Sequence, residues 1–282
     1  MKNLLNKKII IGYIGKKSVL AKSFVKNYKN QFIFKVYVGD IRDYKKISSW
    51  LEKNKNINIF INFAAITSSE ICQRFKKRAF DVNYKSVKKL LDLLNKTKMD
   101  NFVYFLSLST SHVFKKSNHI LTENSKKKPS TYYGVTKLAL EQYILKNKNK
   151  YSYKIGIARI FNYHNKLLKK GFFMNDIIQK LKNKKKIIRF KNINTYRDFV
   201  SMEDINTGLL KMIQLNLVND YNICSGVKIY LPNIINFLNK KFKNKFIYFK
   251  KNITLSIYGS NVKLRKKGWK IKNKNLLNEF PD

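Results

Sequence analysis

The sequence has 282 residues, 44% of them hydrophobic, and a formal net charge of +44 at pH 7. This length and apolar content are sufficient for one large domain or two unequal lobes with a sizeable core. Every apolar run is interrupted before the roughly 18 residues of a membrane helix, and two cysteines are too few for a disulfide framework. We therefore expect a protein of the reducing cytoplasm with no membrane partner.

Lysine supplies almost all of the positive charge and is spread along the whole chain. Lysine, asparagine and isoleucine are abundant together, which is typical of a coding bias toward A- and T-rich codons. A dedicated nucleic-acid-binding arm would instead concentrate the charge in one segment. We therefore interpret most lysines as solvated surface and expect no specific nucleic-acid partner, although the charge can attract a polyanionic substrate.

The chain begins with a short apolar run at residues 8–11, followed by Gly-Tyr-Ile-Gly at residues 12–15. Apolar side chains then recur at helical spacing from residue 19 to residue 25. The pattern predicts a strand, a glycine turn and a helix. A signal peptide is the alternative for this charged and apolar start, but the glycines stand where its cleavage site would belong.

The segments that follow continue this alternation. Further strands are predicted at residues 32–38, 57–63, 102–108 and 155–160, and helices at residues 82–95 and 132–145. Alternating strands and helices predict an α/β fold with a Rossmann-like, doubly wound parallel sheet.

Beyond residue 162 the alternation becomes irregular. A helix is expected at residues 173–181, an extended segment at 187–190 and a helix at 204–215. We therefore divide the chain into a first domain, residues 1–162, and a smaller C-terminal lobe, residues 163–282. The boundary is soft, and we expect some crossing of the chain between the two parts.

A glycine turn between a first strand and a helix is a common place for a bound pyrophosphate. The backbone can approach the phosphates there, and the helix N-terminus offers free N–H groups. We expect Gly12 and Gly15 in this turn, with Ile14 between them and Ser18 in the place of a third glycine. Because the spacing departs from Gly-x-Gly-x-x-Gly, an ordinary strand-to-helix turn remains the alternative.

Short motifs along the chain resemble, in order, those of the extended short-chain dehydrogenases/reductases, which include sugar-nucleotide epimerases and dTDP-4-dehydrorhamnose reductases. The glycine spacing Gly-x-x-Gly-x-x-Gly belongs to this family. The other matching segments are residues 39–43, 62–65, 81–83, 109–114, 133–137, 159–162, 197–200 with Asp204, 221–223 and 264–269. A chance set of short motifs would not follow the family order, so the chain is identified by resemblance as a member.

The resemblance implies that the first domain binds a dinucleotide, NAD or NADP, and that the C-terminal lobe binds substrate. In this family the first Asp of a segment like residues 40–43 contacts the adenine, and the alanines after the next strand line the cofactor. The residues assigned to the cofactor in this way are Gly12, Ile14, Gly15, Asp40, Ile41, Ala64, Ala65, Asn83 and Lys137.

The choice between NAD and NADP depends on the end of the second strand. An acidic residue there would hydrogen-bond the ribose hydroxyls of NAD, whereas basic groups accommodate the extra phosphate of NADP. Residues 32–38 contain Lys35 and no carboxylate, and Arg42 follows, which favours NADP. The loop that commonly carries the selecting residue is shortened, and strand alternation can point Lys35 away, so NAD stays open.

Hydride transfer at a carbinol carbon must be coupled to proton transfer at its oxygen. Tyr133 and Lys137 are four residues apart on a predicted helix and therefore share a face. We expect the charges of Lys137 and of the nicotinamide to lower the pKa of Tyr133. Tyr132 is the competing tyrosine, but the residue four positions after it is Thr136, not a lysine.

The resemblance adds Thr110 as the third catalytic residue, at the end of the preceding strand. It competes with the neighbouring serines, and we prefer it because it lies three residues before Val113, the usual register of the family. The expected catalytic set is therefore Thr110, Tyr133 and Lys137.

The expected substrate is a sugar nucleotide. Asn162 and Arg197 match family positions that contact the substrate diphosphate, although local hydrogen bonds are the alternative role for both. Ser111 and His112, which we also expect to contact the substrate, stand where the sugar-nucleotide 4,6-dehydratases have an acidic pair. Because neither is a carboxylate, we expect an epimerase or a 4-keto reductase that serves cell-surface polysaccharide synthesis, not a dehydratase.

Two further expectations concern partners and alternatives. In many relatives the helices that match residues 82–95 and 132–145 pair into a four-helix bundle, so we expect a homodimer. A non-catalytic NAD(P)-binding sensor of the same fold is the alternative function, although a sensor has no use for the proton-transfer group. None of His112, His119 and His164 has metal-ligand spacing, so no metal is expected.

Overall fold

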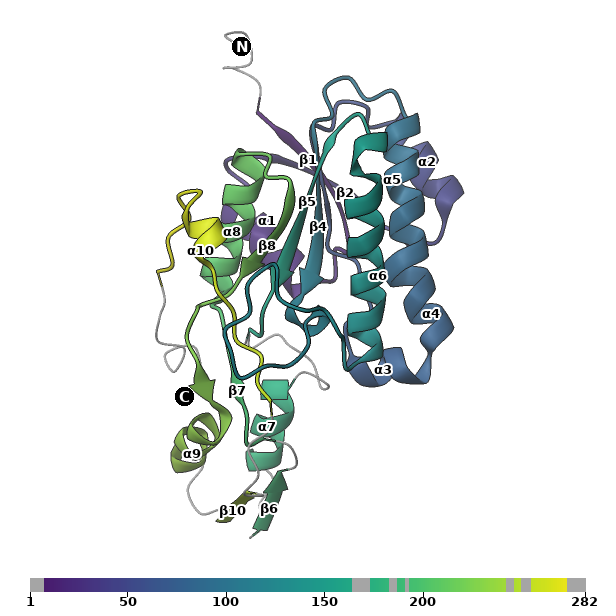
Figure 1. Ribbon diagram of the computed structural model, residues 1–282. Helices are drawn as coiled ribbons and strands as arrows, with labels where there is room; N and C mark the ends of the chain where they lie inside the picture. Colours follow the sequence, from purple (N-terminus) through teal and green to yellow (C-terminus); the bar gives the residue numbers. More distant parts are fainter. Residues whose placement is uncertain are drawn as a thin grey trace.

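The computed structural model describes residues 8–163, 173–182, 187–190, 193–241, 246–249 and 255–272. A sheet of six parallel strands, in the order β2-β1-β3-β4-β5-β8, lies at the centre of the molecule (Figure 1). Its strands are β1 (Ile10–Ile14), β2 (Ile33–Tyr37), β3 (Ile59–Asn62), β4 (Tyr104–Thr110), β5 (Lys154–Ile160) and β8 (Asn219–Ile223). Every residue of β3 and β4 is buried, as expected of strands covered on both faces.

Helices cover both faces of this sheet (Figure 1). The helices α2 (Tyr44–Glu52), α5 (Ser86–Lys96) and α6 (Tyr132–Asn147) pack on one face, and α1 (Val19–Tyr28) and α8 (Met202–Gln214) pack on the other. This arrangement confirms the predicted Rossmann-like, doubly wound α/β fold. None of the helices in the described part of the chain combines the length and the apolar character of a bilayer-spanning segment.

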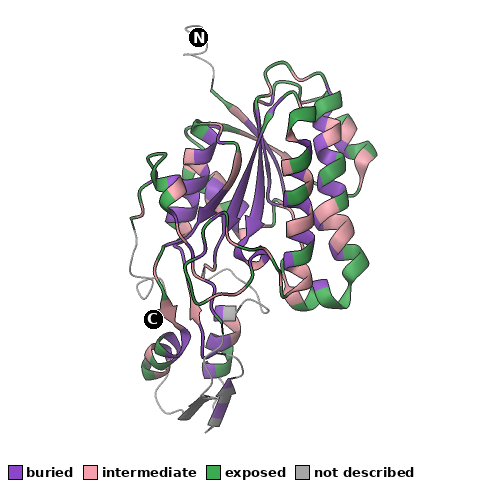
Figure 2. Ribbon diagram, viewed as in Figure 1, coloured by how far each residue is buried: buried purple, intermediate pink, exposed green. Residues whose placement is uncertain are grey.

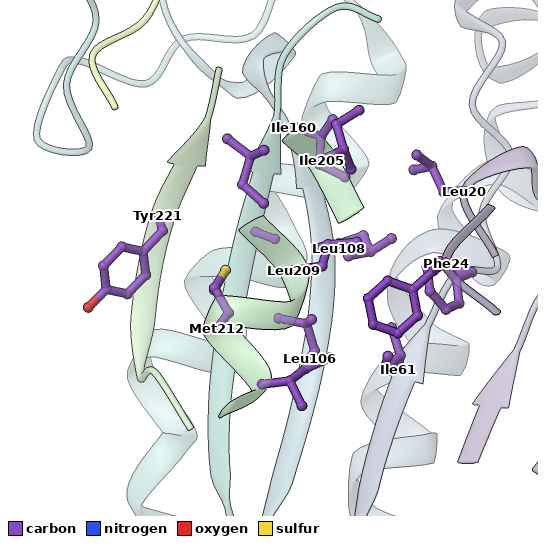
Figure 3. Packing of buried hydrophobic residues seen from close by; sticks show 14 of the residues in the cluster. Leu20, Phe24, Ile61, Leu106, Leu108, Ile160, Ile205, Leu209, Met212 and Tyr221 are labelled. Atoms are coloured by element: carbon purple, nitrogen blue, oxygen red, sulfur yellow. The ribbon is translucent and has the colours of Figure 1, made fainter. Parts of the chain in front are cut away.

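The spacing of apolar residues explains why these helices form and which face they bury. In α5, Val87, Leu90, Leu91 and Leu94 recur at intervals of three and four, and all are buried. The outer surfaces of the helices are exposed while the sheet between them is buried (Figure 2). On the opposite face, side chains of α1 and α8 meet those of the central strands (Figure 3).

The helix predicted at residues 82–95 begins earlier in the structure. A helical segment runs from α4 (Lys76–Phe80) through the π-helical turn η2 (Asp81–Lys85) into α5. Residues 81–83 therefore lie inside this segment and not at its start. The sequence did not predict this earlier start because Ala79 is the only buried residue of α4, so the helix has no repeating apolar pattern.

The chain crosses the expected boundary at residue 162. Both α8 and β8 belong to the second half of the sequence, yet β8 pairs with β5 and extends the sheet. β8 was not predicted because Asn219, Asp220 and Asn222 interrupt its apolar pattern. Polar residues are tolerated there because β8 is the edge strand of the sheet. The buried Asn222 also has hydrogen-bond partners, since its backbone N donates to Glu123 Oε1 and its Nδ2 donates to the carbonyl of Leu121.

Most of the remaining second half forms a smaller lobe below the sheet in Figure 1, whereas α10 (Val262–Arg265) lies beside β8. It contains α7 (Phe173–Lys182), β6 (Ile187–Phe190), β7 (Tyr196–Arg197), β9 (Ile229–Tyr230), α9 (Leu231–Lys241) and β10 (Phe246–Phe249). Side chains of α7 and α9 form its own apolar cluster. The remaining short elements are α3 (Ser69–Arg74) and the 3-10 helices η3 (Ser111–Val113) and η4 (Lys148–Lys150).

Candidate active site

A cavity of about 780 Å³ lies at the carboxyl ends of the central strands. Its lining comes from the segments that follow β1, β2, β3, β4 and β5, from α6, and from Met174 and Phe199 of the second half. In open α/β sheets this edge is where ligands bind, because the strand ends and the helix N-termini converge there. The cavity is therefore the candidate active site.

The turn after β1 is built for close approach of a ligand to the backbone. Gly15 has φ of 94°, and a Cβ on it would lie 2.6 Å from the amide nitrogen of Ala64. Any side chain at this position would be strained and would clash. Ser18 precedes α1 and makes no capping hydrogen bond with its side chain, which leaves the first-turn N–H groups of α1 for a ligand.

The structure corrects the position of this turn. Gly12 lies in the middle of β1, where the side chains of Ile57 and Phe60 fill the space of a Cβ, and Ile14 is buried in the core. Neither Gly12 nor Ile14 lines the cavity, whereas Gly15 and Ser18 do. These positions favour a three-residue spacing that begins at Gly15 and continues through Ser18 to the buried Ala21, instead of one that begins at Gly12.

The segment after β2 lines the end of the cavity expected to hold the adenine. Asp40 and Ile41 are both in its lining. Arg42 donates to Asp40 from Nε at 2.9 Å and from Nη2 at 2.5 Å, and these hydrogen bonds lower the pKa of Asp40 to about 2. Lys35, by contrast, donates to Asn56 at 2.8 Å and is absent from the lining, so it gives no support to NADP.

Basic side chains surround this end of the cavity. Arg42 and Arg78 act on Asp40, and Lys17 and Lys22 line the same cavity near residues that follow β1. Lys17, Lys22 and Arg78 were not identified from the sequence, because lysines occur throughout the chain and nothing in the local pattern distinguishes those that face a cavity. Their charge favours a polyanionic ligand such as a dinucleotide.

Asn62 at the end of β3 is a further residue that sequence reasoning missed. Ala64 and Ala65 line the cavity as expected, and the amide of Ala64 donates to Asn62 Oδ1 at 3.0 Å. The Asn62 side chain is only 2% exposed, and its Nδ2 has no partner. A buried donor without an acceptor is costly, so this amide suits a ligand oxygen in the cavity. Together with the Gly15 turn, it fits the expected cofactor.

Asn83 supports the site but does not line the cavity. Its Oδ1 accepts from Ile66 N at 2.8 Å, and its Nδ2 donates to Ile66 O at 2.9 Å and to Thr136 Oγ1 at 3.0 Å. The structure thus gives the side chain of Asn83 a supporting role within the protein, and no direct place in the cavity expected to hold the cofactor. It fastens the loop after β3 to α6, and every polar atom of its amide is engaged by the protein.

α6 brings two of the three expected catalytic residues to the cavity. Tyr133 and Lys137 both line it, whereas Thr110 ends β4 outside the lining and forms a hydrogen bond with Tyr133. The helix starts here because Thr131 Oγ1 accepts from Gly134 N at 3.1 Å. A Cβ on Gly134 would overlap the carbonyl of His112, so glycine allows α6 to approach the end of β4. Tyr132 is not part of the lining.

The electrostatics of this pair differ from the expectation. Burial raises the pKa of Tyr133 well above its usual value, and a hydrogen bond with Thr110 lowers it by less. Burial also lowers the pKa of Lys137 to about 8, against the opposing charge of Glu141. The protein alone therefore does not favour tyrosinate, because desolvation of the buried hydroxyl has the largest effect on the pKa of Tyr133.

Ser111 and His112, in η3, both line the cavity next to the catalytic residues. The ring of His112 meets that of Tyr133 edge to face, with 5.9 Å between the centroids. Burial lowers the pKa of His112 to about 4, and Arg197 and Lys116 add to this effect. His112 is therefore neutral at pH 7.

Asn162 lines the cavity, whereas Arg197 does not. Nδ2 of Asn162 donates to the carbonyl of Asp198 at 3.0 Å. Arg197 is half-buried, its Nη1 has no partner, and burial lowers its pKa. The buried carboxylate of Asp198 accepts from Ser225 N at 2.8 Å and so fixes the segment that carries Arg197. Tyr163 also lines the cavity and was not predicted.

The lowered pKa of His112 predicts how stability depends on pH. The unfolded chain binds a proton near pH 6.5 and the folded chain only near pH 4, so folding loses stability as pH falls through this window. The loss attributable to His112 reaches up to about 3 kcal/mol. Urea unfolding of wild type and His112→Asn at pH 7 and pH 4.5 measures it. An equal acid sensitivity of the two proteins would contradict the assignment.

No cluster of metal-binding side chains occurs among the described residues. The two cysteines are buried and unpaired. His164 lies outside the described residues.

Comparison with known proteins identifies the family. The family model described as GDP-mannose 4,6 dehydratase matches residues 2–269, so the chain belongs to that family. This confirms the resemblance to the extended short-chain dehydrogenases/reductases.

Solved structures agree on the fold. RMD from Pseudomonas aeruginosa in complex with NADPH is 19% identical, with a TM-score of 0.81 over 95% of this chain and 97% of the other. UDP-glucose 4-epimerase of Thermus thermophilus in complex with NAD is 14% identical, with a TM-score of 0.81 over 96% and 98%. The dTDP-glucose 4,6-dehydratase DesIV of Streptomyces venezuelae is 14% identical, with a TM-score of 0.79 over 94% and 92%.

Proposed function

We propose that the protein is an NAD(P)-dependent enzyme that reduces a 4-keto sugar or epimerises the sugar of a sugar nucleotide. The observation that carries this proposal is that Tyr133 and Lys137 line one cavity beside Ser111 and His112, while Thr110, at the end of β4, forms a hydrogen bond with Tyr133. Similar structures, each under 20% identical, contain NADPH or NAD and include a UDP-glucose 4-epimerase. Dehydration is not proposed because Ser111 and His112 provide no carboxylic acid.

Each residue has a chemical role in this proposal. The nicotinamide cofactor, when bound, supplies or accepts the hydride. Lys137 holds the ribose of the cofactor, and Tyr133 transfers a proton to or from the sugar oxygen that becomes a hydroxyl or a carbonyl. The hydroxyl of Thr110 hydrogen-bonds the same oxygen. Asn162 and Arg197 bind the diphosphate of the substrate, Arg197 through the Nη1 group that has no partner within the described protein.

A panel of UDP-, GDP- and dTDP-sugars, incubated with and without NADH or NADPH, tests the proposal. Reduction would consume the reduced cofactor in proportion to product, while epimerisation would convert the sugar without net consumption. Tight cofactor binding with no turnover of any sugar or keto-sugar would favour the alternative, an NAD(P)-binding sensor. Formation of a 4-keto-6-deoxy sugar would instead contradict the exclusion of a dehydratase.

For the cofactor, we expect NADP to bind more tightly than NAD. The 2′-phosphate would meet Lys17, Arg42 or Arg78 at the adenine end of the cavity, although Arg42 is already paired with Asp40. Titration of both cofactors into the apoprotein at about 0.15 M ionic strength measures the difference, and salt must be held constant because a +44 surface attracts phosphate nonspecifically. Tighter binding of NAD would contradict the preference and leave the chemistry of Tyr133 untouched.

We also propose a homodimer that pairs the outer faces of α5 and α6. Val135 of α6 is 40% exposed, and Ile71 of α3, a helix that contacts α6, is 47% exposed. Light scattering at micromolar concentration should give twice the monomer mass of 33.4 kDa. A monomer that remains fully active would contradict this assembly.

A further inference from the structure

A buried ionic cluster lies directly behind the catalytic residues. Arg159 of β5 is fully buried, and its Nη2 donates to Glu141 Oε2 of α6 at 2.7 Å. Its Nη1 forms a second ion pair with Asp220 of β8 at 2.5 Å. Ser109 Oγ of β4 donates to Glu141 Oε1, also at 2.5 Å. Glu141 thus accepts hydrogen bonds from two different strands of the sheet.

The position of Glu141 connects this cluster to the site. It lies on α6 one turn after Lys137 and two turns after Tyr133, so the three side chains are on the same side of the helix. Its partner Ser109 immediately precedes Thr110 and itself lines the cavity. Glu141 therefore connects the helix that carries Tyr133 and Lys137 to the strand end that carries Thr110.

Glu141 also acts on Lys137 by its charge. Burial lowers the pKa of Lys137, while Glu141 on the same helix and Cys72 on α3 raise it. Burial raises the pKa of Cys72 to about 11, so its thiol is uncharged at pH 7. Of these two partners, Glu141 is the one that forms an ion pair with Arg159. Asp220 gives a natural comparison, because it also pairs with Arg159 but is absent from the groups that act on Lys137.

We propose that Glu141 is a positioning residue for the proposed reaction, which holds α6 against the end of β4 and supplies negative charge to the buried ammonium of Lys137. The inference rests on the proposed function for its catalytic consequence only. Loss of the charge of Glu141 makes Lys137 release its proton at lower pH, which weakens its hold on the cofactor. Loss of the bond to Ser109 lets Thr110 and Tyr133 move apart.

The test compares Glu141→Gln with Asp220→Asn, since each removes one of the two carboxylates that pair with Arg159. Lysine labelled with carbon-13 at Cε reports the titration of Lys137 in the apoprotein, assigned by its loss in Lys137→Met. Glu141→Gln should lower the Lys137 midpoint by about one pH unit, and Asp220→Asn should leave it unchanged. As pH is raised, the cofactor affinity of Glu141→Gln should begin to fall about one pH unit below the pH at which that of wild type does.

Ser109→Ala tests the positioning role separately, because it leaves both ion pairs of Arg159 intact. We expect a loss in kcat of about tenfold, with an unchanged Lys137 midpoint. Should Glu141→Gln fail to fold, Glu141→Asp takes its place. It keeps the charge, so the Lys137 midpoint should equal that of wild type, while kcat should be lower than that of wild type. Equal Lys137 midpoints in Glu141→Gln and Asp220→Asn, or wild-type kcat in Ser109→Ala, would overturn the proposal. The lysine titration needs no substrate, so it stands independently of the proposed function.

Discussion

Replacement of Tyr133 by Phe should reduce turnover at least about 100-fold and leave cofactor affinity nearly unchanged. The hydroxyl is the group that transfers the proton, and general acid–base catalysis typically contributes this much. The ring stays, so its edge-to-face contact with His112 is preserved and the cavity keeps its shape. Steady-state kinetics with the substrate found in the sugar-nucleotide panel and a fluorescence titration of the reduced cofactor measure the two effects.

Tyr132→Phe is the matched control. Tyr132 precedes Tyr133 on α6, does not line the cavity, and contacts Lys76 through its ring, with 5.7 Å from Nζ to the ring centroid. This variant makes the same chemical change, loss of a tyrosine hydroxyl, at the neighbouring position outside the cavity. We therefore expect turnover within about twofold of wild type. A large loss in Tyr132→Phe together with a small loss in Tyr133→Phe would show that the wrong tyrosine has been assigned.

Replacement of Gly15 by Ala should abolish tight cofactor binding, with a loss in affinity of at least about tenfold. A Cβ at this position meets the backbone of residues 63 and 64 at 2.6 Å, and alanine is strained at φ of 94°. The turn must move, and with it the N–H groups at the start of α1. The strain should also destabilise the protein by about 1–3 kcal/mol.

Gly12→Ala separates the two possible positions of the phosphate turn. Its Cβ would meet the side chain of Ile57 at 2.7 Å in the core, so it should destabilise the protein by a similar 1–3 kcal/mol through overpacking. The cofactor affinity of the folded protein should nevertheless remain close to wild type. Urea unfolding and cofactor titration at low temperature measure the two quantities. A greater loss of affinity in Gly12→Ala than in Gly15→Ala would return the turn to its originally predicted place.

The choice between these glycines shows where sequence reasoning was limited. Gly12, Gly15, Ser18 and Ala21 are all small and are spaced by three, so two registers of the motif satisfy the same pattern. The strand length decides between them, and it depends on pairing with β2 and β3. Apolar periodicity does not locate a strand end when the turn residues Tyr13 and Ile14 are themselves good strand formers.

The sequence by itself determined the alternation of strands and helices, the family and the presence of Tyr133 and Lys137 on one helix. These features depend on local spacing, which the 2.0- and 3.6-residue periods convert directly into faces of strands and helices. The apolar face of α5 and the start of α6 at Tyr132 followed from that spacing alone.

Only the tertiary structure decided which polar side chains face the cavity and how strongly they ionise. Asn62 and Asn83 both belong to motifs near the cofactor segment, yet one has a buried amide nitrogen without a partner and the other is fully engaged by Ile66 and Thr136. Desolvation raises the pKa of Tyr133 in the protein alone, an effect that the spacing of Tyr133 and Lys137 does not reveal. Burial and hydrogen-bond partners come from elements distant in the sequence, and they set the free energy of each charged form.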